Sequence, residues 1–138
     1  MDFIFAPEST GDDVQWQPFQ AETNPGQFWR LELDKVIGGD RRVVYLRSQM
    51  WSEKAQQARL ETGSDDGIKI WLNGKMVFVN DISRGCTPGD DVVDVSLQKG
   101  WNTLMLKVVN KSGGWAACAR VRQPDGSRIT GLKIQAAQ

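Results

Sequence analysis

The sequence has no histidine and only two cysteines, Cys86 and Cys118, among its 138 residues. Without histidine, a Ser-His-Asp triad, a Cys-His pair and an imidazole zinc site are excluded. Two cysteines outside a CxxC motif are too few for a thiolate metal cage. They either pair in an oxidising compartment or remain two separate thiols, because a disulfide requires a geometry that the sequence does not supply.

Net charge and long apolar runs are also absent. Lysine plus arginine number 17 and aspartate plus glutamate number 17, so the formal charge is zero. The basic stripe expected of a nucleic-acid-binding protein is therefore missing. No apolar run approaches the ~20 residues needed to cross a membrane. These features predict a protein that binds neither nucleic acid nor membrane.

The opening residues of the sequence do not predict a signal peptide. These residues, Met-Asp-Phe-Ile-Phe-Ala-Pro, have neither the basic start nor the longer apolar core of such a peptide. A chain of 138 residues is long enough to bury most of the apolar surface of one domain. We therefore expect residues 1–138 to form a single domain excised from a larger multidomain protein.

The strongest local pattern that is present is a hairpin. Apolar residues at alternate positions of Ile68–Leu72 are typical of a half-buried strand. Asn73-Gly74 then supplies two residues that tolerate positive φ, as a type I′ turn requires. Met76–Val79 follows as the returning strand, so the pattern predicts an antiparallel sheet.

Turn residues recur about every ten positions, which is the spacing expected of a sandwich or barrel. The other alternating runs predict strands at Phe28–Asp34, Arg42–Trp51, Gln56–Thr62, Val93–Leu97, Trp101–Val109 and Ala116–Arg122. With the hairpin, these runs predict about eight antiparallel strands and almost no helix. The predicted fold class is therefore an all-β sandwich.

Three segments carry a resemblance to a known family: Gly63-Ser-Asp-Asp-Gly-Ile-Lys-Ile-Trp-Leu-Asn-Gly-Lys75, Lys99-Gly-Trp-Asn-Thr-Leu-Met-Leu-Lys-Val108, and Gly113-Gly-Trp115. The chain resembles, over roughly residues 14–134, the galactose-binding-like jelly-roll modules that are appended to bacterial polysaccharide-degrading enzymes. The resemblance implies an extracellular or cell-surface carbohydrate-binding module without catalytic activity. Its expected partners are a polysaccharide or oligosaccharide and a linked catalytic domain.

Aromatic and planar polar side chains share one face of the predicted strand Arg42–Trp51. We expect Arg120, from Ala116–Arg122, to project on the same sheet face. Rings that stack on sugars beside planar donors that bind hydroxyl or carboxylate groups predict a sugar-binding platform. Its members are Tyr45, Arg47, Gln49, Trp51 and Arg120. The alternative is a solvated face with ordinary cross-strand pairs.

Two further tryptophans have competing interpretations. Trp115 follows the flexible Gly113-Gly114 pair, and we expect it at the rim of the sandwich as a sugar-binding residue. Trp101 begins a predicted strand beside a turn, and we expect it to pack in the core, where a buried Trp contributes a large apolar surface.

The adjacent carboxylates Asp65 and Asp66 are the predicted metal ligands. Oxygen ligands suit Ca²⁺, and the Asp-Asp-Gly element resembles a calcium-dependent lectin sandwich of the PA14 type. We expect any bound calcium to be structural; the alternative is that these residues simply form a turn.

A further alternative for the whole chain is a structural β-sandwich that packs on a neighbouring catalytic domain and binds no sugar. The acidic residues define no pocket for glycoside hydrolysis, so we expect no catalysis.

Overall fold

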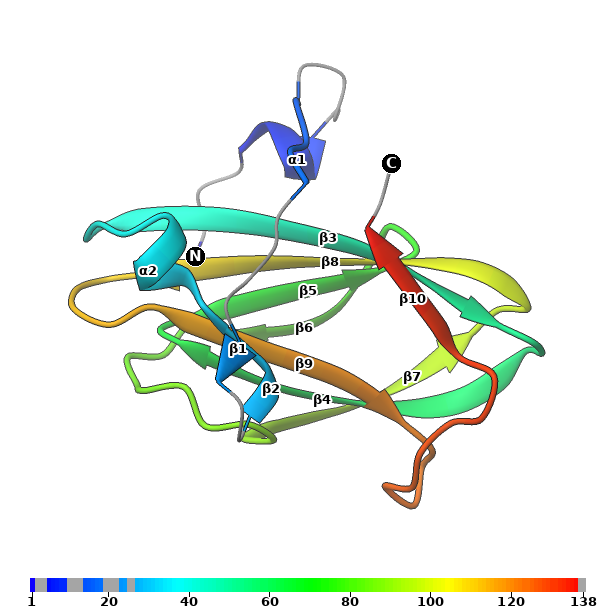
Figure 1. The fold of residues 1–138 in the computed structure, drawn as a ribbon. Coiled ribbons are helices and arrows are strands. Elements are labelled where there is room, and N and C mark those ends of the chain that lie inside the picture. Colours follow the sequence, from blue (N-terminus) through cyan, green and yellow to red (C-terminus); the bar gives the residue numbers. More distant parts are fainter. Residues whose placement is uncertain (2–4, 10–13, 19–22, 25–26, 137–138) are drawn as a thin grey trace.

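Two antiparallel sheets pack face to face in the structure, a computed structural model that describes residues 1, 5–9, 14–18, 23–24 and 27–136 (Figure 1). Sheet A contains, in spatial order, β1 (Thr23–Asn24), β2 (Gln27–Glu32), β9 (Ala116–Arg122), β4 (Gln56–Asp65) and β7 (Asp91–Leu97). Sheet B contains β10 (Lys133–Ala136), β3 (Arg42–Ser52), β8 (Gly100–Asn110), β5 (Ile68–Leu72) and β6 (Lys75–Asn80). All of these described strands pair in the antiparallel sense.

This architecture confirms the predicted all-β sandwich. The eight predicted strands correspond to β2–β9, whereas β1 and β10 are too short, at two and four residues, to leave a clear alternating pattern. The predicted strand Phe28–Asp34 ends early, because the chain leaves β2 after Glu32 and forms the short helix α2 (Leu33–Val36). This change of direction carries Leu33 into the core, where it is 0% exposed. The other helix, α1, is Ala6–Ser9.

The core lies between the two sheets and follows from the period of two along each strand. In β7, buried and exposed positions alternate without interruption from Asp91 to Leu97. Ala58 and Leu60 point inward from sheet A, and Ile70 and Leu106 point inward from sheet B. Each fully buried Leu or Ile side chain contributes about 1.5–3 kcal/mol. The alternate positions on the same strands point away from the core and form the outer faces of the two sheets.

The β5–β6 hairpin has the predicted turn. Asn73 and Gly74 have φ values of 52° and 78°, so both central residues are in the left-handed region that a type I′ turn requires. The Asn73 side chain also anchors the turn to β8, since its Oδ1 accepts a hydrogen bond from the Thr103 N–H at 2.8 Å and its Nδ2 donates to Asn102 Oδ1 at 2.9 Å. The turn therefore holds the end of sheet B as well as joining two strands.

Candidate functional site

The outer face of sheet B is built from rows of side chains that lie opposite one another on neighbouring strands. Paired residues on neighbouring strands project to the same side of a sheet. Four of these rows matter for the site: Tyr45, Lys107 and Lys69; Arg47, Met105 and Trp71; Gln135, Gln49 and Thr103; and Lys133, Trp51 and Trp101. We call the first two the covered rows and the last two the open rows.

The N-terminal segment lies over the first covered row. Helix α1 sits on the side of sheet B that faces away from sheet A (Figure 1). It places the carboxylate of Glu8 among three donors: Oε1 accepts from Tyr45 Oη and from Lys107 Nζ, each at 2.5 Å, and Oε2 accepts from Lys69 Nζ at 3.1 Å. The Lys107 ammonium lies 5.2 Å from the centroid of the Phe5 ring. Lys107 is only 1% exposed, so this charge is largely withdrawn from water.

The pKa values of Glu8 and Tyr45 shift in opposite directions. Burial by itself raises the pKa of Glu8, but hydrogen bonds from Lys107, Tyr45 and Lys69 outweigh it and hold the pKa below its ordinary value. Burial, followed by the hydrogen bond donated to Glu8, raises the pKa of Tyr45. The carboxylate form of Glu8 is thus the form that the folded protein favours.

The second covered row is partly shielded by the same segment. Arg47 Cζ lies 5.4 Å from the centroid of the Trp16 ring, a cation–π distance. Tyr45 and Arg47 therefore lie on the predicted face, but the chain's own N-terminal residues are packed against them. Of the four predicted platform residues on β3, this leaves Gln49 and Trp51 outside the covered rows.

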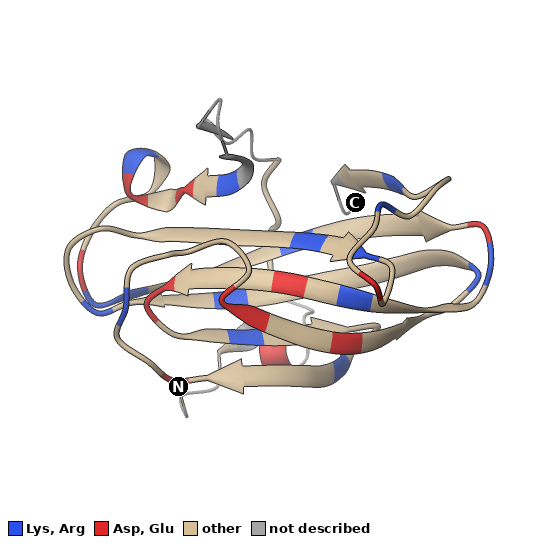
Figure 2. Ribbon diagram, turned by 90° about the horizontal axis from the view of Figure 1, so that it is seen from below, with Lys and Arg blue, Asp and Glu red and all other residues tan. Residues whose placement is uncertain are grey.

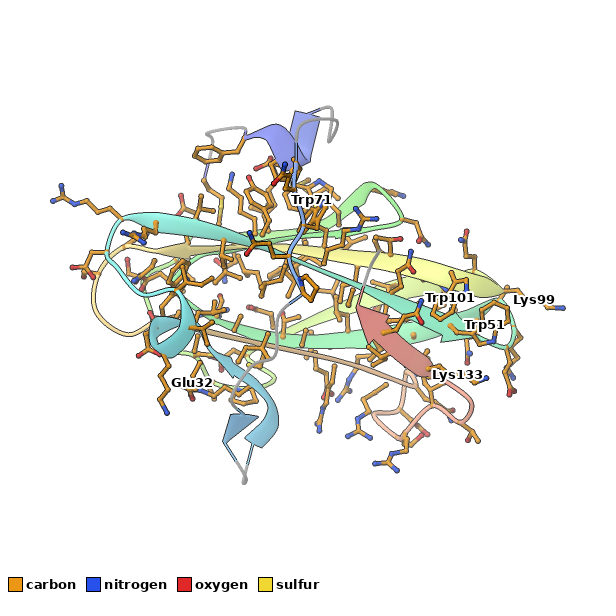
Figure 3. The ribbon with its side chains drawn as sticks, turned by 45° about the horizontal axis from the view of Figure 1, so that its top comes forward. Glu32, Trp51, Trp71, Lys99, Trp101 and Lys133 are labelled. Atoms are coloured by element: carbon orange, nitrogen blue, oxygen red, sulfur yellow. The ribbon has the colours of Figure 1, made fainter. Side chains whose placement is uncertain are left out.

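The open rows end in two tryptophans that face one another across β3 and β8. The ring centroids of Trp51 and Trp101 lie 5.4 Å apart with an interplanar angle of 72°, an edge-to-face pair. Trp101 is 39% exposed. Figure 3 shows this pair beside Lys99 and Lys133 at one end of the sheet, whereas Trp71 lies apart from them near α1.

Planar amides continue the open surface beside the tryptophans. Gln135 Nε2 donates to Gln49 Oε1 at 3.4 Å, and the Gln135 side chain is exposed. Both residues carry a donor and an acceptor, which are the groups that sugar hydroxyls need. This end of the face can therefore combine ring stacking with hydrogen bonding.

A tight turn delivers Trp101 to this position. Gly100, which precedes it, has a φ of 93°, a conformation that L side chains rarely adopt. Asn102 holds the turn from inside: its Nδ2 donates to Gln98 O at 2.9 Å, and its Oδ1 accepts from the Gln98 N–H at 2.9 Å. Asn102 is itself 0% exposed. The motif Lys-Gly-Trp-Asn-Thr thus has a structural explanation in which the buried Asn orients the exposed Trp.

The expectations for Trp101 and Trp115 were both wrong. Trp101 is exposed instead of packed in the core, and Trp115 is 1% exposed in the core instead of lying at the rim. The alternation of the two faces along each strand indicates the observed placement. Trp115 is two positions before the inward Ala117 and shares its face, whereas Trp101 is three positions before the inward Leu104 and lies on the other face. A sugar cannot stack on Trp115 while the fold is closed.

Arg120 does not join the predicted platform. It belongs to β9 in sheet A, and its Nε donates to Glu61 Oε1 at 2.6 Å, while Arg59 Nε donates to Glu61 Oε2 at 2.8 Å. Burial by itself raises the pKa of Glu61, but the hydrogen bonds from Arg59 and Arg120 outweigh it and lower the pKa. Acidic and basic positions are interleaved in this way over the strands (Figure 2). Arg120 therefore compensates a buried carboxylate on the opposite side of the sandwich.

Asp65 and Asp66 stand at the end of β4, where Asp66 holds two loops. Asp66 Oδ1 accepts from the Arg84 N–H at 3.1 Å, and Oδ2 accepts from the Lys111 N–H at 2.8 Å. Burial, followed by the charge of Asp66, raises the pKa of Asp65 to about 6. Within the described ranges, no three of the Cys, Asp and Glu side chains gather as a metal ion requires. The Asp66 carboxylate is therefore engaged by two backbone donors, and a calcium ion at Asp65 and Asp66 stays a prediction.

Fold and site together define an all-β sandwich with a polar and aromatic surface at one end of sheet B. No protein-family model matches the chain, and no curated protein sequence matches it. Neither helix in the described part of the chain has the length and hydropathy needed to cross a membrane.

Proposed function

We propose that this chain is a non-catalytic carbohydrate-binding module whose ligand, a polysaccharide or oligosaccharide, binds the open rows of sheet B. The observation that carries the proposal is the edge-to-face pair of Trp51 and Trp101, with Trp101 39% exposed. A pyranose presents an apolar C–H face that stacks on an indole ring, and Gln49 and Gln135 offer donors and acceptors for hydroxyl groups in the neighbouring row of the same face. The resemblance to galactose-binding-like jelly-roll modules supports the same function.

The shape of the surface favours an extended ligand. The open rows run across three strands, β10, β3 and β8, so their side chains form a face and not an enclosed cavity. The exposed Lys133, opposite Trp51, adds a positive charge at one margin. A glycan chain lying along the strands would contact the aromatic pair in one sugar unit and the amides in the next.

In its parent protein, the module would act from outside the cell or on the cell surface. Binding to an insoluble polysaccharide raises the effective concentration of a linked catalytic domain at its substrate. This role requires no catalytic residue in the module itself.

The test compares tryptophans on the same sheet face. Trp101→Ala and Trp51→Ala should each weaken glycan binding by several-fold or more, since an aromatic contact contributes about 1 kcal/mol or more. The matched control is Trp71→Ala, which removes a ring from a covered row. Affinity electrophoresis against a panel of plant and bacterial polysaccharides, followed by calorimetry on any that bind, gives the affinities. Loss of binding in Trp71→Ala with retention in Trp101→Ala would place the site elsewhere.

A structural accessory module is the second candidate. Exposed apolar side chains on the edge strand β6 favour it: Met76 is 49% exposed and Val79 is 46% exposed. Such side chains suit a contact with a neighbouring domain. Wild-type protein that binds no polysaccharide on a broad panel supports this candidate over the first. The calcium-dependent lectin stays a prediction, and binding that EDTA abolishes is its test.

A further inference from the structure

The two cysteines meet outside the main core. Cys86 lies in the loop between β6 and β7, and Cys118 lies in β9, 32 positions later. Their Sγ atoms are 3.2 Å apart. Both side chains are buried, at 7% and 1% exposure, and with Ala116 they form a small cluster of their own between the loop and the outer face of sheet A.

A missing side chain on the neighbouring strand makes room for this contact. Gly63 in β4 is paired with Cys118 in β9. A Cβ atom at Gly63 would lie 2.2 Å from the Thr87 carbonyl oxygen and 2.9 Å from Cys118 Sγ. The loop can therefore pass directly over this strand only because position 63 is glycine.

The loop is also held on both sides of Cys86. Arg30, which is paired with Cys118, donates from Nη1 to the Cys86 carbonyl oxygen at 2.9 Å. Arg84 donates from Nε to Ser64 O at 3.1 Å and from Nη1 to Asp91 Oδ1 at 3.1 Å. These bonds come from side chains of sheet A and of the loop itself, so the position of Cys86 does not depend on the thiol contact.

We propose that Cys86 and Cys118 form an intramolecular disulfide bond when the protein meets a low-molecular-weight disulfide oxidant, and that the bond fastens the β6–β7 loop to β9. With oxidised glutathione, the Cys86 thiolate attacks one glutathione sulfur and releases one glutathione thiolate. The Cys118 thiolate then attacks Cys86 Sγ in the mixed disulfide and releases the second. The two cysteines lose two electrons and two protons, and one glutathione disulfide becomes two thiols.

Cys86 is the sulfur that reacts first. It is the more exposed of the two. The hydrogen bond with Cys118 and the nearby Arg30 and Arg84 guanidinium groups lower the pKa of its thiol. A thiol with more thiolate at neutral pH attacks a disulfide faster, within the limit set by its lower nucleophilicity.

The bond has a consequence for stability that is independent of sugar binding. A cross-link between positions 32 residues apart restricts the unfolded chain and thereby favours the folded state. Such a bond persists in oxidising compartments and is rare in the cytosol. A disulfide bond between Cys86 and Cys118 in the native protein would therefore indicate that the protein works in an oxidising compartment.

The experiment uses the full chain equilibrated with oxidised glutathione or with dithiothreitol. After oxidation, we expect thiol titration in denaturant to find no free thiol, and the intact mass to fall by about 2 Da for the two lost hydrogens. We expect reduction to lower the Tm of wild type by about 10 °C. The control is the double variant Cys86→Ser/Cys118→Ser, whose Tm should be the same in both conditions.

Three results would overturn the proposal. The first is two titratable thiols after oxidation, and the second is a glutathione adduct or a covalent dimer in place of the internal bond. The third is an internal bond whose reduction leaves the Tm of wild type unchanged. Because oxidised and reduced wild type are compared directly, the test stands even if the double variant does not fold. None of these measurements involves a glycan, so their outcome is separate from that of the binding test.

Discussion

Trp115 and Trp101 have the same side chain but opposite surroundings. Trp115 is 1% exposed and belongs to the core cluster that includes Leu33 and Ala117, and its Nε1 has no hydrogen-bond partner among the described residues. Trp101 projects from the outer face of sheet B and contacts Trp51. The apolar surface of the first stabilises the fold, whereas that of the second is available to a ligand.

Alanine substitutions should separate these two roles. Trp115→Ala should lower the free energy of unfolding by about 3–5 kcal/mol, because it empties a large buried site. Trp101→Ala should lower it by about 1 kcal/mol or less, since its ring retains contact with water in the native state. Urea denaturation measures both. A cost for Trp101→Ala equal to that of Trp115→Ala would contradict the assignment of Trp101 to the surface.

At the scale of secondary-structure elements, one glycine decides how a loop crosses a strand. Gly63 lies in β4 at the position over which the Cys86–Thr87 part of the loop passes. Gly85 lies in the same loop, but nothing comes within 4 Å of a Cβ atom built there. The two glycines therefore provide a matched comparison between a position that excludes a methyl group and one that accepts it.

Gly63→Ala should destabilise the protein by about 1–3 kcal/mol, the usual range for overpacking. Gly85→Ala should stay within about 0.5 kcal/mol of wild type, as exposed substitutions usually do. Both are measured under reducing conditions, so that the state of the cysteines does not contribute. Equal stability of the two variants would mean that the loop does not lie against β4 as described.

At the scale of the whole molecule, the N-terminal segment is held on sheet B by a charge cluster. Glu8 is 99 positions away from Lys107, yet their side chains form an ion pair at 2.5 Å. Lys69 and Lys107 face one another on neighbouring strands, and like charges in this arrangement repel. The Glu8 carboxylate offsets that repulsion, so the sheet and the N-terminal segment stabilise one another.

Glu8→Gln should reveal the stabilisation by the Glu8 carboxylate as a pH-dependent change in the free energy of unfolding. The pKa of Glu8 is lowered in the folded protein, so its contribution is complete above the unfolded value of about 4.3 and is lost as pH falls through the lower folded value. At pH 7 we expect the variant to be less stable by about 1–3 kcal/mol, since Lys107 and Lys69 lose their counter-charge.

Denaturation curves between pH 7 and pH 3 provide the measurement. The difference between wild type and Glu8→Gln should shrink as Glu8 becomes protonated in wild type. Glu53→Gln, at an exposed position, removes the same charge and serves as the control. A difference that stays constant over the whole pH range would refute the role assigned to the carboxylate.

Alternation and turn chemistry were enough to predict the all-β sandwich, eight of the strands and the type I′ turn. These features depend on residues that are neighbours in sequence, because the two-residue period of a strand and the φ values of a turn are local properties. The same period correctly assigned Gln49 and Trp51 to an outer face. The same period also indicates the observed placement of Trp101 and Trp115. The expectation for these two residues was wrong because it depended on the neighbouring turn and loop instead.

The tertiary structure alone decided which outer face each strand contributes to and what covers it. Arg120 and Trp51 both project outward, but β9 and β3 belong to different sheets, so the two residues lie on opposite sides of the sandwich. The covering of Tyr45 by Glu8 and the meeting of Cys86 with Cys118 join segments 37 and 32 positions apart. Such contacts depend on the order of strands and the path of loops, which alternation along a single strand does not encode, because every strand of a sandwich has the same two-faced pattern.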